Sequence, residues 1–285
     1  MYVITGASGQ LGRLVIEQLL EKVPAAQIVA AVRSTEKAAD LAALGVQVRH
    51  ADYAKPETLT SAFAGAEKIL LISSSEVGQR AAQHQAVIDA ARHAGVQLLA
   101  YTSVLHADTS LLGLADEHRQ TEAALAASEL PTVLLRNGWY NENYTAGIQG
   151  ALAHGAHFGC AGDGRISSAA RADYAAAAVA VLTSGENQAG KVYELAGDES
   201  YTLTDLAAEI ASASGKSVVY TDLPQADFES ALLGAGLPDF VAQLLADSDA
   251  AASKDALFDD QRQLSALIGR PTTPIKASVK AALGL

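Results

Sequence analysis

Three glycines near the start of the chain stand at a spacing that can bind a phosphate. They are Gly6, Gly9 and Gly12 in the segment VITGASGQLG, which follows a short β-branched run and opens a stretch of helical periodicity. In such a turn the glycines permit a tight bend, close approach of the backbone to a pyrophosphate, and packing of the helix on the strand. The helix N-terminus then offers free N–H groups to the anion. The motif predicts a dinucleotide site, with a ligand-free Gly-rich turn as the alternative.

The residue that ends the second predicted strand indicates which dinucleotide binds. A site for NAD usually has an acidic residue there, which binds the ribose diol, but this chain has Arg33. A guanidinium can bind a 2′-phosphate through two parallel hydrogen bonds, so we expect NADPH rather than NADH. The alternative is a solvated surface arginine. Asp52 and Tyr53, after the third predicted strand, are candidates for the adenine edge or for an ordinary loop.

These residues must be positioned by elements that the first half of the chain predicts clearly. Short apolar runs rich in β-branched residues alternate with stretches of helical periodicity, which is the pattern of βαβ units. The predicted strands are Tyr2–Thr5, Ile28–Val32, Gln47–His50, Lys68–Ile72, Leu98–Thr102 and Thr132–Arg136. The predicted helices between them are Leu11–Glu21, Ala38–Ala43, Thr58–Phe63, Gln79–Ala94 and Asp116–Ala127. Because parallel strands need crossovers, we expect an α/β fold with a Rossmann-type, doubly wound parallel sheet.

The second half of the chain predicts a smaller α/β lobe. We place the Rossmann domain at residues 1–138 and the substrate-binding lobe at residues 139–285, with a return of the chain to the Rossmann sheet around residues 165–200. The later predicted elements are helix Asp173–Leu182, strand Lys191–Leu195, and helices Leu203–Ser212 and Gln225–Leu233, the third of these starting at Thr202 or Thr204 as a cap. A cleft between the two parts is the expected substrate site.

Composition excludes several classes of protein. The formal net charge of −12, without a Lys/Arg cluster, disfavours nucleic-acid binding. No apolar run approaches the ~18 residues that span a bilayer, and no basic leader with a cleavage site precedes the first strand, so we expect no membrane insertion and a cytoplasmic location. Cys160 is the only cysteine and has no Cys or His neighbour at ligand spacing, so we expect neither a disulfide nor a metal.

Several segments together carry a family resemblance. They are TGASGQLG, Arg33, LISSSEVGQR from Leu71, LRNGWYNENY from Leu135 and ARADY from Ala170. With them the chain resembles the NmrA-like branch of the atypical short-chain dehydrogenase/reductases, and within it the bacterial type-2 NAD(P)H:quinone oxidoreductases, over essentially its whole length. Triphenylmethane dye reductases resemble it more distantly.

The resemblance implies a cofactor site and a reaction. It implies that Gly6, Ala7, Ser8, Gly9, Gln10, Leu11 and Arg33 hold the adenosine half and the pyrophosphate of NADPH, that Ser73, Ser74 and Ser75 serve the nicotinamide half, and that Asn137, Gly138, Trp139, Tyr140, Asn141, Glu142 and Arg171 complete the site. The implied reaction is direct hydride transfer to a small-molecule quinone, a two-electron reduction to hydroquinone without flavin or metal.

Catalytic side chains are harder to assign. Short-chain dehydrogenases that oxidise alcohols generally use a Tyr and a Lys four residues later, but here Leu114 and His118 stand at those positions. Quinone reduction tolerates the loss, because it needs chiefly an aligned hydride transfer at about 3–3.5 Å. Asn137 or Tyr140 can hydrogen-bond the quinone oxygen, and His118 can donate a proton or simply pack on its helix face.

Aromatic residues and the missing relay leave alternatives open. Trp139, Tyr140 and Tyr144 can form flat walls for a quinone ring, although Trp139 and Tyr144 are equally well explained as core aromatics. The absent Tyr/Lys pair also keeps open an NADP(H)-binding redox-sensing regulator without catalysis, and a different pocket shape would suit another conjugated acceptor such as a triphenylmethane dye. The oligomeric state is left open.

Overall fold

The computed structural model describes residues 1–285 and divides them into two compact units. Unit 1 comprises Met1–Ala107, Asp116–Asn137 and Ala172–Tyr193. Unit 2 comprises Asp108–Ala115, Gly138–Arg171 and Glu194–Leu285. The chain therefore leaves unit 1 after the sixth strand and returns to it for one helix and part of a last strand.

A seven-stranded sheet in the order β3-β2-β1-β4-β5-β6-β8 is the centre of the fold. Its strands are β1 (Tyr2–Thr5), β2 (Ile28–Val32), β3 (Gln47–His50), β4 (Lys68–Leu71), β5 (Leu98–Val104), β6 (Thr132–Asn137) and β8 (Val192–Leu195). The pairs from β3 to β6 are all parallel. The direction of winding reverses between β1 and β4, and in doubly wound sheets ligands bind outside the carboxyl ends of the strands at such a reversal.

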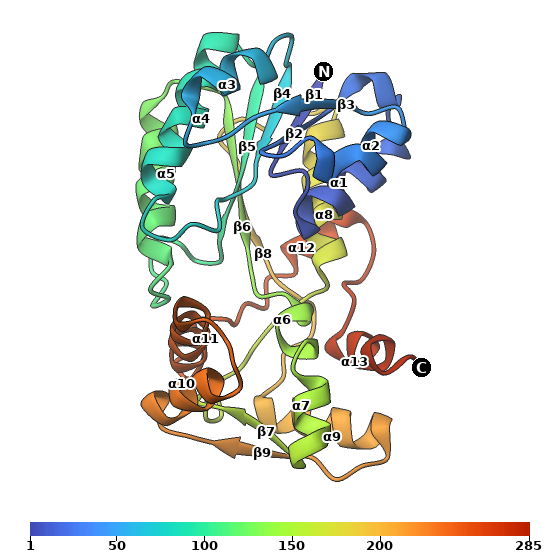
Figure 1. The fold of residues 1–285 in the computed structure, drawn as a ribbon, viewed down its shortest axis with the longest axis vertical. Helices are drawn as coiled ribbons and strands as arrows, with labels where there is room; N and C mark the ends of the chain where they lie inside the picture. The colour runs from blue at the N-terminus through green and yellow to red at the C-terminus, as the bar shows by residue number, and fades with distance from the viewer. The chain divides into compact units, whose positions relative to one another are not determined.

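The strands read as apolar runs because helices cover both faces of the sheet. All five residues of β2 and all seven of β5 are buried. In Figure 1, α3 (Pro56–Ala62), α4 (Arg80–Ala94) and α5 (Ala115–Ala127) lie on one side of the sheet, and α1 (Gln10–Leu20), α2 (Ala39–Ala43) and α8 (Arg171–Thr183) lie on the other. Fully buried residues from strands and helices pack together in this core, among them Val3, Val29, Ile69, Leu99, Leu59, Phe63 and Val87.

Unit 2 is mostly helical around a small sheet. Its two strands, β7 (Ala156–Gly159) and β9 (Val219–Asp222), are parallel. Its helices are α6 (Asn141–Thr145), α7 (Ile148–His154), α9 (Leu203–Ser214), α10 (Gln225–Gly234), α11 (Asp239–Ala252), α12 (Gln263–Ile268) and α13 (Ile275–Leu283). A capping box starts α9, because the Thr202 side chain accepts from Asp205 N–H and the Asp205 carboxylate accepts from Thr202 N–H.

The sequence-based expectations for the first half are confirmed closely. The doubly wound α/β class holds, and β1, β2 and β3 have the predicted bounds. β5 and β6 are longer than predicted by two residues and one residue at their C-terminal ends. In the second half, β7 and β9 were not predicted, and neither were α6, α7, α11, α12 and α13. β7 and β9 have four residues each, and only Gly159 among them is buried, so they lack the apolar signal of a core strand.

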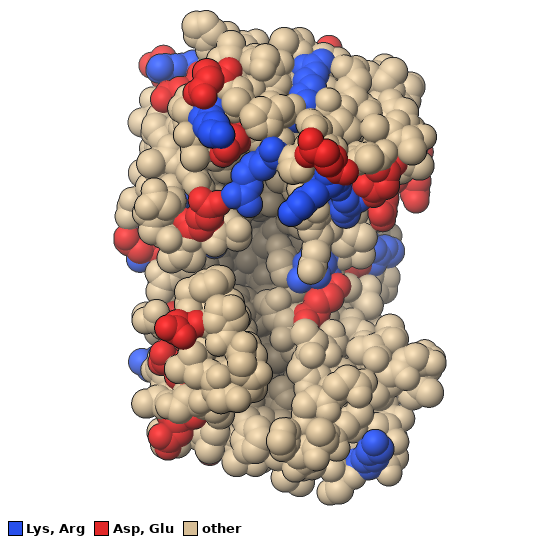
Figure 2. Space-filling view, in the orientation of Figure 1, with Lys and Arg blue, Asp and Glu red and all other residues tan.

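Charged side chains of both signs are mixed on the visible surface. Figure 2 shows that, where unit 1 forms the displayed face, Lys and Arg side chains are interspersed with Asp and Glu and do not gather in one basic patch. None of the helices is long and apolar enough to cross a membrane.

Candidate functional site

The Gly-rich turn joins β1 to α1 in the geometry of an anion site. Gly6 has a φ of +58°, in the left-handed region that favours glycine, and Gly9 N–H donates to the Gly6 carbonyl at 2.9 Å. Helix α1 then begins at Gln10 with Gly9 as its N-cap. No side chain caps this N-terminus, and its first turn holds no acidic residue. Its N–H groups and positive dipole end are therefore available to an anion.

The third glycine is required by packing rather than by conformation. A Cβ at Gly12 would lie 2.6 Å from the Gly6 carbonyl oxygen and 2.7 Å from the Ala7 Cα, both of which are backbone atoms that cannot move aside. A Cβ at Gly9 would lie 3.1 Å from the same oxygen. The tight turn at Gly6 and the close packing at Gly12 are therefore those expected from the spacing. The close approach of a pyrophosphate at Gly9 remains a prediction.

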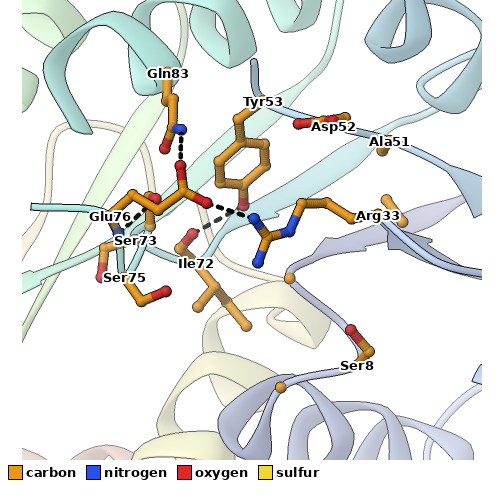
Figure 3. Close-up of a pocket in the computed structure, with 14 residues that line it drawn as sticks. Ser8, Arg33, Ala51, Asp52, Tyr53, Ile72, Ser73, Ser75, Glu76 and Gln83 are labelled. Atoms are coloured by element: carbon orange, nitrogen blue, oxygen red, sulfur yellow. Dashed lines mark hydrogen bonds and ion pairs between the residues drawn. The ribbon is translucent and has the colours of Figure 1, made fainter. Parts of the chain in front are cut away.

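A cavity of about 250 Å³ opens at the carboxyl ends of β1, β2 and β4. It lies within unit 1, and its walls come mainly from the segments that follow β1, β2, β3 and β4, with Gln83 from α4. We call it the unit 1 cavity. Its lining is Gly6, Ser8, Gly9, Ala31, Arg33, Ala51, Asp52, Tyr53, Ile72, Ser73, Ser74, Ser75, Glu76 and Gln83. Figure 3 shows the labelled members of this set around it.

Hydrogen bonds from side chains in and near the sheet fix the first residues of the segment after β4, Ile72 and Ser73. Ile72 N–H donates to Thr5 Oγ1 at 3.1 Å, and the Ile72 carbonyl accepts from Tyr53 Oη at 2.9 Å. Ser73 N–H donates to Thr102 Oγ1 at 2.9 Å. Side chains from β1, from the loop after β3 and from β5 therefore fix the backbone that lines the cavity.

Helix α4 holds the next residue of that segment from the other side. The Arg80 Nε donates to the Ser74 carbonyl at 2.5 Å, and Ser74 N–H donates to His84 Nε2 at 2.9 Å. Because His84 Nε2 accepts, the ring carries its proton on Nδ1, which donates to Thr121 Oγ1 at 2.9 Å. Burial lowers the pKa of His84 to about 4, and the charge of Arg80 adds to this effect. His84 is therefore a neutral acceptor at neutral pH and can hold this backbone N–H.

Arg33 lies at the rim of the unit 1 cavity, as its place after β2 predicts. Its guanidinium forms an ion pair with Glu76, through Nη1 and Oε1. The resemblance assigned Ser73, Ser74 and Ser75 to the nicotinamide half of NADPH and Arg33 to the adenosine half. Glu76 directly follows these serines, yet it forms the ion pair with Arg33. The two groups of expected residues therefore line one cavity.

Several lining residues were not singled out from the sequence. Glu76 follows β4 in a loop, and no periodicity marks it as the partner of Arg33, which lies more than forty positions earlier. Gln83 lies in α4, and its hydrogen bond is to Glu76. Asp52 and Tyr53 were candidates for the adenine edge or for an ordinary loop; both line the cavity, and Tyr53 Oη donates to the Ile72 carbonyl. Within the Gly6–Leu11 turn, three of the expected residues do not line the cavity: Ala7 is fully buried, Leu11 is 8% exposed, and Gln10 is exposed on the first turn of α1. Asn137, the five residues after it and Arg171 do not line it either.

His118 lies in the interior of unit 1. It is 4% exposed, its Nδ1 is 2.7 Å from Tyr101 Oη, and its Nε2 is 3.5 Å from Arg80 Nη1. Burial lowers the pKa of His118 to about 3, and the positive charge of Arg80 adds to this. It does not line the unit 1 cavity. An acid role would need a protonated ring, which this environment disfavours at neutral pH. The proton-donor role expected from the sequence remains an untested prediction.

Asn137, the last residue of β6, has a buried side chain whose acceptor lacks a partner. It is 6% exposed, and its Oδ1 is buried without a hydrogen-bond partner. A buried acceptor without a donor is costly, and a donor on a ligand would relieve that cost. This orphaned atom and the uncapped helix α1 are the observations on unit 1 that fit a bound dinucleotide.

The expected residues that follow Asn137 belong to unit 2. The Arg171 guanidinium lies 4.7 Å from the centre of the Tyr140 ring, and Arg171 N–H donates to the Glu142 carboxylate at 3.0 Å. Gly138 N–H donates to the Leu195 carbonyl at 2.7 Å. Arg171 therefore contacts both Tyr140 and Glu142. Their assignment to one cofactor site remains a prediction.

Asn141 is bonded entirely within the protein. Its Nδ2 donates to the Thr273 carbonyl at 3.0 Å and to Ser278 Oγ at 2.8 Å, and its Oδ1 accepts from Ser168 Oγ at 2.6 Å. The side chain is fully buried. These hydrogen bonds connect α6 to α13 and to Thr273 just before it. A direct contact of Asn141 with a cofactor remains a prediction.

Unit 2 contains its own cavity, of about 800 Å³, which we call the unit 2 cavity. Trp139 and Tyr144, the expected aromatic walls, both line it. Its other walls are Asn143, Ala146, Gly147, Gly150, Ala151, His154, Ala156, His157, Phe158, Phe228, Ala231, Leu232, Gly234, Ala235, Leu237, Leu245 and Asp249. Most of these side chains are apolar, so the cavity suits an apolar ligand.

One carboxyl group interrupts the apolar lining. Asp249 is 7% exposed, and its Oδ2 accepts from Cys160 N–H at 3.1 Å. Burial raises the pKa of Asp249 to about 7; the hydrogen bond from Cys160 N–H opposes the rise and the charge of Asp222 adds to it. A Cβ at Gly159 would lie 2.7 Å from the Asp249 carboxyl, so a glycine is needed where the strand passes it. Sequence reasoning missed this group.

Comparison with known proteins places the chain among nicotinamide-dependent reductases. A family model described as NAD(P)H-binding matches residues 6–185. Quinone oxidoreductase 2 of Escherichia coli K12 is 61% identical over 279 residues, which are 98% of this chain and 97% of that protein. The crystal structure of an E. coli NADPH-dependent quinone oxidoreductase complexed with NADPH is similar with a TM-score of 0.97 and 60% identity, covering 99% of this chain and all of that one. Citrobacter sp. triphenylmethane reductase complexed with NADP(H) is similar with a TM-score of 0.95 and 40% identity, covering 99% and 100% of the two chains.

Proposed function

The chain belongs to the NAD(P)H-binding family, in its NmrA-like branch, and on that premise we propose that it is an NADPH-dependent reductase of quinones. The observation that carries the proposal is the uncapped N-terminus of α1 beside a cavity whose rim holds Arg33. Nearly full-length identity of 61% to a quinone oxidoreductase supports the choice of acceptor.

Unit 1 supplies the cofactor's anion-binding groups. The turn from Gly6 to Leu11 and the first N–H groups of α1 would hold the pyrophosphate, because the dipole and the free donors both favour an anion there. Arg33 would hold the 2′-phosphate, for which a guanidinium provides two parallel donors. Asn137 Oδ1 would accept from the cofactor or the substrate.

Unit 2 supplies an apolar site that suits a quinone. The unit 2 cavity holds the indole of Trp139 and the ring of Tyr144, which can pack against a flat acceptor. Tyr140, whose ring lies against Arg171, does not line this cavity, and a hydrogen bond from its hydroxyl group to a quinone oxygen remains a proposal from the sequence. Few polar groups line the cavity, so it would exclude water from the acceptor.

The chemistry needs little from the protein beyond positioning. When bound, NADPH supplies a hydride from C4 of its nicotinamide ring. A quinone that accepts this hydride becomes an aromatic hydroquinonate, a weakly basic anion that takes a proton from water to give the hydroquinone, so a strong acid from the protein is not required. The chain's residues therefore bind and orient the two reactants, which matches the absence of a Tyr-x-x-x-Lys pair from α5.

The test is an assay of NADPH oxidation by purified protein with a simple benzoquinone. We expect the loss of reduced-nicotinamide absorbance to exceed the rate without protein, and to be faster with NADPH than with NADH. Tight NADPH binding with no acceleration by any quinone would refute the proposed quinone reductase, leaving a cofactor-binding sensor or a reductase of another conjugated acceptor as the alternatives.

A further inference from the structure

The ion pair at the rim of the unit 1 cavity joins residues from two different strand ends. Arg33 follows β2 and Glu76 follows β4, and Figure 3 shows their side chains pointing toward each other. The side chains are 66% and 42% exposed, so solvent screens the pair and its own contribution to stability is small. Its position matters more, because one partner is the group expected to bind the 2′-phosphate.

Glu76 is the better fixed of the two partners. Its Oε2 accepts from Gln83 Nε2 at 2.7 Å, and its backbone N–H donates to Ser74 Oγ at 3.1 Å. Gln83 is 8% exposed, and Ser74 is held by α4 as described above. The Arg33 guanidinium is more exposed than the Glu76 carboxylate, and its hydrogen bond is to Glu76 itself. No further hydrogen bond holds the guanidinium as Gln83 holds Glu76. A ligand that competes for the pair will therefore displace the arginine from the carboxylate.

The two reduced cofactors differ at the atom that this pair would meet. NADPH carries a phosphate on the adenosine 2′ oxygen, with about −1.5 to −2 charges near neutral pH, as other phosphate monoesters do. Such a group cannot use both sides of the Arg33 guanidinium while Glu76 occupies Nη1, and the nearby carboxylate repels it. NADH carries a 2′-hydroxyl, which can donate a hydrogen bond to a carboxylate. In sites for NAD that acceptor usually follows β2, where this chain has Arg33.

We propose that Glu76 is a specificity-determining residue that opposes the 2′-phosphate and accepts the 2′-hydroxyl, so that Glu76 and Arg33 together set the ratio of NADPH to NADH affinity. This inference rests on the proposed function, because it requires a nicotinamide dinucleotide in the unit 1 cavity. It adds a residue that the Gly-rich motif and Arg33 do not reveal.

The test compares binding rather than turnover. Glu76→Gln removes the charge and keeps an amide oxygen that can accept from Gln83 Nε2. The dissociation constants of NADPH and NADH are measured by calorimetric titration of the wild type and the variant at one ionic strength. We expect the affinity ratio of NADPH to NADH to rise at least threefold in Glu76→Gln. A smaller rise, no change or a fall would overturn the inference.

The matched control is Glu36→Gln. Glu36 lies three residues after Arg33, is exposed, and accepts from Ser34 rather than from Arg33. Glu36→Gln removes a negative charge near Arg33, as Glu76→Gln does. The NADPH to NADH affinity ratio should change less than half as much in Glu36→Gln as in Glu76→Gln. An equal change would overturn the inference, because it would show that only the overall negative charge near Arg33 matters. Wild type that binds neither cofactor would refute the proposed function as well, whereas wild type that binds both with an unaltered ratio in Glu76→Gln refutes this inference alone.

Discussion

Replacing Asp249 with asparagine should change how the stability of unit 2 depends on pH. The carboxyl is 7% exposed, and burial raises its pKa from the usual 3.8 to about 7. Between those two pH values the unfolded chain has released the proton while the folded chain keeps it. The folded state then binds more protons than the unfolded state, so the free energy of unfolding must fall as pH rises.

The size of the effect follows from the shift. Each pK unit corresponds to about 1.4 kcal/mol, so a shift of about three units costs the folded state about 4 kcal/mol once both forms are ionised. Between pH 5 and pH 8 the linkage relation gives about 2.5 kcal/mol of that cost. In Asp249→Asn the side chain carries no proton to lose, and its amide oxygen can still accept from Cys160 N–H. The variant should therefore gain about 2.5 kcal/mol relative to wild type over this range.

The assay is urea unfolding of the cofactor-free protein at several pH values. Trp139 is the only tryptophan and lines the same cavity as Asp249, so its fluorescence reports on the relevant unit. Taking the difference between variant and wild type cancels the titration of every other group. Asp239→Asn is the matched control, because Asp239 is exposed at the start of the same helix and should leave the pH dependence as in wild type.

The reasoning fails if the stability difference between Asp249→Asn and wild type is constant from pH 5 to pH 8, or falls with rising pH. A constant difference would mean that the carboxyl is hydrated in the folded protein. A falling difference would mean that the ionised form is the favoured one in the fold.

Further predictions concern unit 1. Arg33→Asp should abolish the preference for NADPH over NADH in binding titrations, since a carboxylate repels the 2′-phosphate; an unaltered ratio would show that the guanidinium points elsewhere. Gly12→Val should sharply reduce either the yield of soluble folded protein or the increase in Tm on adding NADPH, because the new Cβ would lie 2.6 Å from the Gly6 carbonyl oxygen. A Tm increase with NADPH as large as that of the wild type would contradict this prediction. His118→Gln should gain stability relative to wild type as pH falls from about 6.5 toward 4, because the unfolded state then protonates a histidine whose folded pKa burial lowers to about 3. A difference that stays level on acidification would mean that the folded ring is readily protonated.

The sequence predicts the cofactor half of the molecule better than the rest, for physical reasons. A buried strand such as β2 reads as an unbroken apolar run, and the glycines of the turn are required by contacts only a few residues away. Arg33 was predictable because its place after a strand fixes where it points. Its partner Glu76 was not, since that pairing depends on how β4 ends and on Gln83 from α4.

Unit 2 was predicted less well because its signals are weak or nonlocal. The short strands β7 and β9 are half exposed, so they show no core alternation. Trp139 and Tyr144 were expected as possible walls, and they do line the unit 2 cavity. The sequence did not predict that the Asp249 carboxyl is buried, because a single acidic residue in a helix usually faces solvent. Only the fold brings Gly159 and Cys160 into contact with it.

The late arrival of β8 has a consequence for biosynthesis. Unit 1 needs β8 to complete its sheet and α8 to cover part of one face, yet residues 138–171 of unit 2 leave the ribosome before them. Translation delivers about 5–20 residues per second, so the nascent protein spends seconds with the edge of β6 unpaired. An open strand edge is a template for pairing with other chains. The fold therefore cannot be completed domain by domain during synthesis, and a chaperone that shields strand edges should raise its yield.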